Sequence, residues 1–283
     1  MGILLALIPA IGWGIQPLIA RKVGGTPANQ IVGTGLGALL IGLIIWLING
    51  SVSGTAFWLS FGAGFLWSLG QVGQYISFTH LGVTRTMPIS TGLQIIGTSL
   101  IGVLAFGEWP GNTAKLIGAV TILLVIIGVA LTAITDHKGQ GATSIGYGLS
   151  ILVPTTIGYW AYGALPKMIH AAGIQLFFPE MLGIFVGSLI YALVRTKGAA
   201  LGQKETWQNG FIGIVFGISS LAYIFAAQSA GVATAFVITQ LNVVVSTLGA
   251  MLLLHEGKSH RELRYTLVGL GLIVIGSMMT ATL

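Results

Sequence analysis

Long apolar runs alternate with short polar or turn-forming stretches along nearly the whole chain. A helix needs roughly 20 apolar residues to cross a hydrocarbon core of about 30 Å, so the pattern predicts about ten transmembrane helices. The first run lacks a positive segment before it and is followed by Arg21 and Lys22. We therefore expect it to be a spanning helix and not a cleaved signal peptide. The expected helices are 2–20, 29–48, 56–79, 86–106, 115–134, 144–165, 174–194, 208–229, 232–254 and 265–282.

Composition leads to the same expectation. Charged residues make up 6% of the 283 positions, against roughly 25% in an ordinary soluble domain. Hydrophobic residues reach 54% and the mean hydropathy is +0.94, so most of the surface must face lipid. The pI near 9.7 does not indicate nucleic-acid binding, because the basic residues are scattered and a phosphate-binding face needs them clustered.

The basic residues are distributed unequally between alternate connections. Cytoplasmic loops of membrane proteins carry an excess of Lys and Arg. The even-numbered connections carry only Lys115 and Lys167. This asymmetry predicts that the odd-numbered connections lie in the cytoplasm and that both termini lie outside. The odd-numbered connections carry Arg21, Lys22, Arg85, Lys138, Arg195, Lys197, Lys204, Lys258, Arg261 and Arg264.

Residues 1–140 and 141–283 resemble each other at a shift of about 150 residues. Five helices in each half is an odd number, so the second copy must lie upside down relative to the first. The expected fold is an all-α integral membrane protein in which ten helices form two inverted five-helix repeats. Such repeats place a solute site near the membrane midplane, between the halves. The matching segments are 29–33 with 179–183, 81–83 with 230–232, and 106–108 with 254–256.

Several segments together point to a known family, namely 12–14 with Pro17, Lys22 with Gly24 and Gly25, 71–74, 87–94 and 106–109. They resemble the bacterial glucose and ribose uptake proteins, a family of the drug/metabolite transporter superfamily. The resemblance covers essentially the whole chain, and residues 87–94 are its most specific part. It implies a ten-helix inverted repeat in the bacterial cytoplasmic (inner) membrane, and sugar uptake coupled to protons as a symport.

Amide and aromatic side chains within the predicted helices are the candidate substrate-binding residues. An amide both donates and accepts hydrogen bonds, which suits sugar hydroxyls. Trp67, Gln71 and Gln74 are spaced to share one helix face, and lipid exposure of all three would be costly, so we expect this stripe to line a cavity. For each single amide a bond between neighbouring helices is an equal alternative. The full predicted set is Trp13, Gln16, Trp67, Gln71, Gln74, Gln94, Gln240 and Asn242.

Glu180 is the candidate proton-coupling residue. It lies in the predicted helix 174–194, and an acid within a span is costly and indicates a functional site by default. The alternative is a shallow acid that reaches the outer interface. Its repeat-equivalent, Gln30, cannot titrate, so only one half could carry such a proton.

Other residues have structural interpretations. Glu108 and Glu256 end equivalent helices, and we expect each to cap the helix that follows it or to pair with Lys115 or Arg261. Pairs of glycines four residues apart allow close helix approach, which permits sliding between helices and a homodimer. The aromatic residues of the predicted sixth helix, Tyr159, Trp160 and Tyr162, are expected in the interfacial belt unless they lie deep in the membrane. The glycine pairs are Gly33 with Gly37 and Gly183 with Gly187.

Known reactive motifs do not fit this chain. There is no cysteine, the sequence before Gly257 lacks the first glycine of a P-loop, and His255, Glu256 and His260 do not have the zinc-protease spacing. We expect no cofactor, no metal site and no enzymatic activity. The partners are expected to be a sugar, a proton and membrane lipid. An exporter of amino acids or other small metabolites would share the fold and remains the alternative function.

Overall fold

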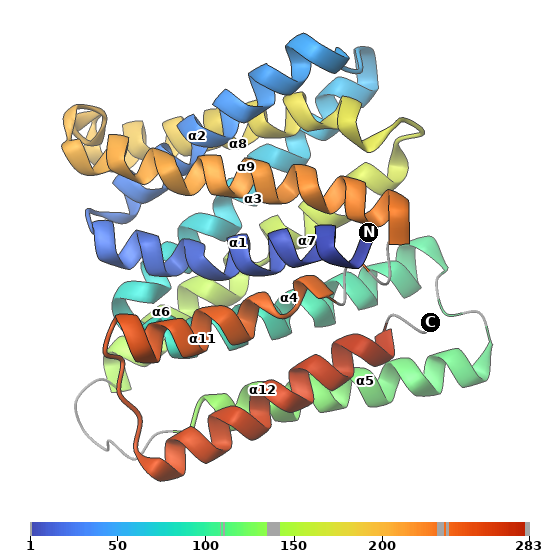
Figure 1. Ribbon diagram of the computed structural model, residues 1–283, viewed down its shortest axis with the longest axis vertical. Helices are drawn as coiled ribbons and strands as arrows, with labels where there is room; N and C mark the ends of the chain where they lie inside the picture. Colours follow the sequence, from blue (N-terminus) through green and yellow to red (C-terminus); the bar gives the residue numbers. More distant parts are fainter. Residues whose placement is uncertain are drawn as a thin grey trace.

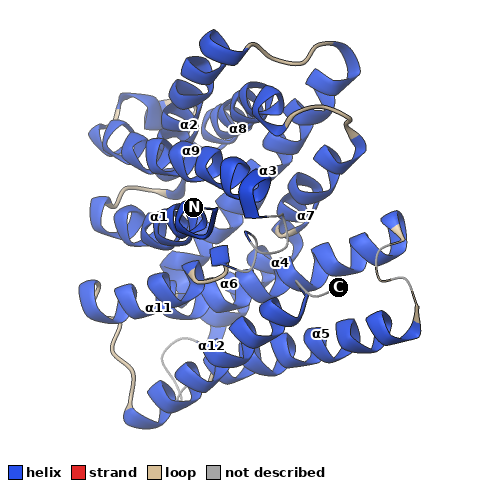
Figure 2. Cartoon of the chain, turned by 45° about the vertical axis from the view of Figure 1, so that its right-hand side comes forward, coloured by secondary structure: helices blue, strands red, loops and turns tan. Residues whose placement is uncertain are grey.

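The computed structural model describes residues 2–107, 109, 111–134, 142–230, 235 and 238–280, and within these ranges the regular structure is helical (Figure 2). This confirms the all-α expectation. The helices are α1 (Gly2–Val23), α2 (Pro27–Asn49), α3 (Gly54–Leu81), α4 (Val83–Phe106), α5 (Asn112–Thr132), α6 (Ala142–Thr155), α7 (Ile157–Ala164), η1 (Leu165–Met168), α8 (Gly173–Thr196), η2 (Ala199–Gly202), α9 (Lys204–Ala230), α11 (Asn242–Leu253) and α12 (His260–Thr280).

Length and apolar composition identify the helices that could cross a membrane. Seven of the described helices meet both conditions, namely α1, α2, α4, α5, α8, α9 and α12. Helix α3 is longer still, at 28 residues, which at about 1.5 Å per residue also exceeds the hydrocarbon thickness. Its amides and serines make it less apolar. These polar residues face other helices.

Two expected helices are divided in the structure. The expected sixth helix becomes α6 and α7, which are separated at Thr156. Pro154 lies just before this break and cannot donate a backbone hydrogen bond. In the expected ninth helix, Gln240 and Leu241 form a turn before α11 begins. Several residues of its first half, 232–234 and 236–237, lie outside the described residues.

The helices pack side by side in a bundle that is stacked in layers (Figure 1). Helix α2 packs on α8 and α9, while α1 packs on α9 and α11. Helix α3 packs on α8 and on the α6–α7 pair. Helices α5 and α12 pack mainly on each other, at the end of the bundle opposite α2 and α8 (Figure 1). Helix α4 lies between that pair and the rest, in contact with α5, α7 and α11.

The paired glycines lie where helix backbones come closest. A side chain at Gly37 would collide with the backbone oxygen of Gly210 on α9. One at Gly183 would collide with the backbone oxygen of Phe61 on α3. Gly33 and Gly187 lie against the same two helices. The expected close approach is therefore confirmed at both pairs, because only the absence of a Cβ leaves room for the facing backbone.

Glu256 caps a helix that is distant in sequence. Its carboxylate accepts hydrogen bonds from the backbone nitrogens of Val83 and Thr84, both at 2.8 Å, at the start of α4. The following helix, α12, is instead capped by Ser259 and Glu262, which bond each other's backbone nitrogens at 3.0 and 3.1 Å. The expectation that Glu256 caps the next helix is wrong, because packing of α11 on α4 brings a more distant N-terminus within reach. Glu108 lies outside the described residues.

Candidate functional site

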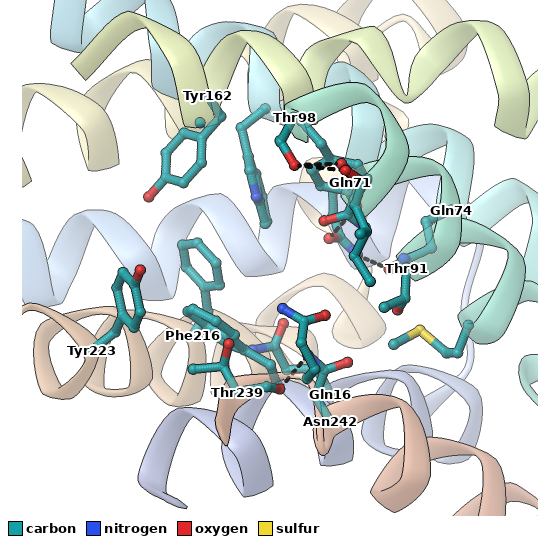
Figure 3. Close-up of a pocket in the computed structure, with 18 residues that line it drawn as sticks. Gln16, Gln71, Gln74, Thr91, Thr98, Tyr162, Phe216, Tyr223, Thr239 and Asn242 are labelled. Carbon is teal, nitrogen blue, oxygen red and sulfur yellow. Dashed lines mark hydrogen bonds between the residues drawn. The ribbon is translucent and has the colours of Figure 1, made fainter. Parts of the chain in front are cut away.

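A cavity of about 260 Å³ lies between α1, α3, α4, α7, α9 and the start of α11 (Figure 3). This is close to the lower end of the usual range for small-molecule sites, about 300 Å³. Its wall contains all eight residues that the sequence predicts for the substrate site. They are Trp13, Gln16, Trp67, Gln71, Gln74, Gln94, Gln240 and Asn242.

The amides of α3 and α4 form one connected hydrogen-bond chain along the cavity wall. The Gln71 Nε2 donates to the Gln74 Oε1 at 3.3 Å, and the Gln74 Nε2 donates to the Ser90 Oγ at 2.9 Å. The Gln94 Nε2 donates to the same Ser90 oxygen at 3.1 Å. Tyr159 on α7 starts the chain by donating its hydroxyl to the Gln71 Oε1 at 2.8 Å. Gln71 and Gln74 therefore line the cavity and cross-link helices at the same time, so the two alternatives are compatible for them, whereas the bond of Gln94 lies within α4.

The α1 wall is different, because two of its side-chain donors are buried without protein partners. Trp13 and Gln16 are three residues apart on one helix face. The Trp13 Nε1 and the Gln16 Nε2 are both buried and make no hydrogen bond. A buried donor without a partner costs about 1–3 kcal/mol. Such donors in a cavity wall are available to a bound solute, whose oxygen atoms could accept from both.

The cavity also has an aromatic end. Trp67 lies against Phe216, with ring centroids 4.5 Å apart, and it approaches Tyr159 and Tyr162 at 6.0 and 6.3 Å. Trp13 on α1 packs against Tyr223 on α9, with ring centroids 5.8 Å apart. In Figure 3 Tyr162, Phe216 and Tyr223 lie at one end of the cavity, while Gln16, Gln74 and Asn242 lie towards the other. The arrangement offers ring faces and hydrogen-bonding groups to one small polar molecule.

The aromatic residues of α7 do not form an interfacial belt. Tyr159 is 7% exposed and bonds Gln71, Tyr162 lines the cavity, and the Trp160 Nε1 donates to the backbone oxygen of Leu93 at 3.0 Å. The belt expectation is wrong for these three residues, because α7 packs on α3 and α4 and turns its aromatics inward. A usable sequence signal was the spacing of Tyr159 and Tyr162, three residues apart and hence on one face.

Glu180 is buried beside this aromatic end. It is 8% exposed, which argues against the alternative of a shallow interfacial acid. The Tyr162 hydroxyl donates to the Glu180 Oε2 at 3.3 Å. Pro179 precedes Glu180 in α8, and the carbonyl of Gln175, one turn back, accepts from the Val52 nitrogen at 3.2 Å and the Ser51 hydroxyl at 3.4 Å. Proline removes the helical donor for that carbonyl, and the connection before α3 replaces it.

Comparison with known proteins identifies the family. The model of a family described as sugar transport protein matches residues 4–283. The chain belongs to this family. It therefore groups with sugar transporters and not with enzymes, and its apolar helices make it a multi-pass membrane protein.

Individual relatives agree with this assignment. A protein of Lactobacillus helveticus named "Putative sugar uptake protein" is 47% identical over 279 residues, covering 98% of this chain and 99% of its own length. A Staphylococcus epidermidis protein named "Putative ribose uptake protein RbsU" is 37% identical over 286 residues, covering 99% and 98%. One solved crystal structure matches with a TM-score of 0.66 at 13% identity, over 99% of this chain and 96% of that one. At that identity the likeness concerns the fold alone.

Proposed function

We propose that this protein takes up a monosaccharide of the glucose or ribose class across the bacterial cytoplasmic membrane by proton-coupled, alternating-access transport. The observation that carries the proposal is the cavity wall, in which amides, ring faces and two unpartnered donors surround one space. A sugar ring has hydroxyl groups for the amides and flat C–H faces for the aromatic rings. The names of the relatives from Lactobacillus and Staphylococcus support the same substrate class.

Alternating access would follow from two inverted repeats, residues 1–140 and 141–283. The packing of the helices supports this division. If the first five spans are α1 to α5 and the second five are α6–α7, α8, α9, α11 and α12, then exchange of the two sets preserves the main contacts. The α1–α9 contact exchanges with the contact of α6–α7 with α3, and α2–α9 exchanges with α8–α3. The α2–α8, α4–α11 and α5–α12 contacts exchange with themselves. A cavity between such halves is where inverted-repeat transporters bind substrate.

Proton coupling would use Glu180. An acid within a membrane span is uncommon and usually functional. Glu180 is buried, and its carboxylate bonds to a tyrosine that lines the cavity. A proton taken up there would be close enough to the sugar to affect its binding.

The test is uptake of radiolabelled D-glucose and D-ribose by the purified protein in liposomes, with and without an inward proton gradient. The expected result is gradient-stimulated uptake of at least one sugar. In Glu180→Gln the stimulation should be lost while sugar exchange without a gradient remains. The matched control is Glu205→Gln, an acid in the first turn of α9, which should keep the stimulation.

The other outcomes separate the parts of the proposal. Stimulation that persists in Glu180→Gln would keep sugar uptake but remove Glu180 from coupling. Absence of uptake of both sugars, with protein shown to be folded, would overturn sugar uptake and favour export of amino acids or other small metabolites.

A further inference from the structure

Tyr162 connects the buried acid to the cavity. Its ring lies 6.3 Å from that of Trp67, and its side chain forms part of the cavity wall (Figure 3). Its hydroxyl donates to the Glu180 Oε2 at 3.3 Å. Glu180 itself is not among the residues lining the cavity. Within the described residues, the contact between acid and cavity therefore passes through this hydroxyl.

Other titratable residues lie on the elements packed around α7 and α8. Helix α2 has no charged residue. Tyr159 is bonded to Gln71, and Tyr223 faces the cavity from α9. The remaining titratable residues on the elements packed around α7 and α8 are Tyr75 and His80 on α3, Arg85 on α4, Tyr147 on α6, Lys167 on η1, Tyr191 and Arg195 on α8, and Lys204 and Glu205 on α9.

The hydrogen-bonding capacity of the two groups makes their contact depend on protonation. A tyrosine hydroxyl has a single hydrogen to donate, and an ionised carboxylate can only accept. With Glu180 ionised, the Tyr162 hydrogen is therefore committed to the carboxylate. A protonated carboxyl carries its own O–H and can donate to the tyrosine oxygen. The hydroxyl hydrogen of Tyr162 is then free to turn towards the cavity and donate to a sugar oxygen.

We propose that Tyr162 is the positioning residue that couples protonation of Glu180 to sugar binding, by donating its hydroxyl to the carboxylate in one state and to the sugar in the other. No proton leaves Tyr162 in this exchange. The proton on Glu180 comes from water and returns to water, while the bond between Tyr162 and Glu180 reverses its direction and Tyr162 forms a new bond to the sugar. Sugar and proton then favour each other's binding, as linkage requires, and this is the coupling that a symporter needs. The inference rests on the proposed function, because it takes Glu180 as the protonated group and a sugar as the solute.

The test is equilibrium binding of radiolabelled D-glucose and D-ribose to purified protein in detergent, measured from acid to mildly alkaline pH. In the unaltered protein, affinity should fall as pH rises and Glu180 ionises. Tyr162→Phe keeps the ring and its contact with Trp67, and it should bind weakly with no dependence on pH. At every pH, Glu180→Gln should bind sugar about as tightly as the unaltered protein does at acid pH. The reason is that an amide can donate to the tyrosine oxygen as a protonated acid does. The difference between the two variants should be about tenfold in affinity, the effect expected for one hydrogen bond.

Tyr159→Phe is the matched control. It removes a tyrosine hydroxyl from the same helix and the same cavity, and it should lower affinity while keeping the pH dependence. Each variant is accepted only if its thermal midpoint shows a folded protein.

The outcomes distinguish this inference from the proposed function. If affinity depends on pH in Tyr162→Phe as it does in the unaltered protein, while Glu180→Gln abolishes the dependence, the role of Tyr162 is wrong and that of Glu180 stands. If Glu180→Gln keeps the dependence, coupling through Glu180 is wrong and the inference falls with it. If neither sugar binds to the unaltered protein, the sugar proposal itself is wrong.

Discussion

At the residue scale, two kinds of polar residue face the cavity, and their burial has different effects on the free energy of unfolding. Gln71, Gln74 and Gln94 are bonded within the protein, so their burial is compensated whether or not a solute is bound. Trp13 and Gln16 carry buried donors with no partner. An unpartnered donor lowers the free energy of unfolding. A binding site can carry this cost because the solute later supplies the missing acceptor.

Gln16→Met should therefore weaken sugar binding without weakening the fold. We expect a loss of about tenfold in affinity for the transported sugar, the effect of one hydrogen bond, and an unchanged or higher thermal midpoint. Asn29→Leu is the contrasting variant, because the Asn29 Nδ2 donates to the Thr206 Oγ1 at 2.9 Å and Asn29 does not line the cavity. It should lower the thermal midpoint by removing a satisfied bond. Equal destabilisation by both variants, with affinity retained in Gln16→Met, would make Gln16 a structural residue.

Lys258 predicts a pH effect on stability. It lies between α11 and α12, where its Nζ donates to the Thr132 backbone oxygen at 3.2 Å and to the Thr266 Oγ1 at 2.7 Å. Burial, reinforced by nearby Arg85 and opposed by Glu262 and Glu256, lowers the pKa of Lys258 from 10.5 to about 8. Between these two values the unfolded chain binds a proton that the folded protein does not, so stability rises with pH. The unfavourable contribution of Lys258 to the free energy of unfolding is therefore complete below about pH 8, and it disappears by about pH 10.5.

The measurement is the thermal midpoint in detergent across that interval. The unaltered protein should gain stability with rising pH relative to Lys258→Met, which has no group to titrate there. The comparison cancels the titration of other groups. A pH profile with the same slope in both proteins would contradict the lowered pKa.

At the scale of elements, helix contacts depend on glycines, which have no side chain, and on a capping residue that is distant in sequence from the helix it caps. Glycines let α2 lie directly against α9 and α8 directly against α3. Glu256 satisfies two backbone donors at the start of α4 from a distant connection, where its negative charge also suits the helix dipole. Close backbone contacts thus hold α9 against α2 and α3 against α8, and both α3 and α9 line the cavity.

Gly183→Ala should destabilise the protein by forcing α8 away from α3. The added methyl group would meet the Phe61 carbonyl oxygen, and backbone cannot turn aside as a flexible side chain can. Overpacking of this kind costs typically 1–3 kcal/mol. Gly62→Ala is the matched control within α3, because nothing lies within 4 Å of the added atom. It should leave the thermal midpoint unchanged or raise it, since alanine is the better helix former. Equal effects of the two variants would contradict the close α3–α8 contact.

At the scale of the whole molecule, the cavity depends on helices from both halves of the chain. Helices α1, α3 and α4 supply one part of its wall, and α7, α9 and the start of α11 supply the other. Helices α5 and α12 contribute no lining residue and pack mainly on each other at one end of the bundle (Figure 1). The α5–α12 pair therefore joins the two halves of the chain without contributing to the cavity wall.

The charge asymmetry of the connections predicts the orientation of this bundle. The chain contains no cysteine, so single cysteines can be introduced without background. Ser53→Cys, in the connection before α3, should react with a membrane-impermeant maleimide in intact cells. Gly202→Cys, between α8 and α9, should react only after permeabilisation. Both positions are exposed. The reverse pattern would place the termini in the cytoplasm.

The sequence by itself determined most of the helical segments and eight of the residues in the cavity wall. The length of an apolar run and the spacing of amides along one helix are local properties, which explains why Trp67, Gln71 and Gln74 could be assigned to one face before any packing was known. Both the interruption of the expected ninth helix at Gln240 and the cap that Glu256 provides for α4 lay beyond that reasoning.

Only the tertiary structure decided the partners of these residues. The inward direction of Tyr159 and Tyr162, the bond between Tyr162 and Glu180, and the absence of a partner for the Gln16 donor depend on which helices become neighbours. The apolar pattern of a membrane helix specifies that it spans, but lipid and protein are almost equally apolar around it. Its rotation and its neighbours are set by close packing and polar contacts between segments that are far apart in the chain.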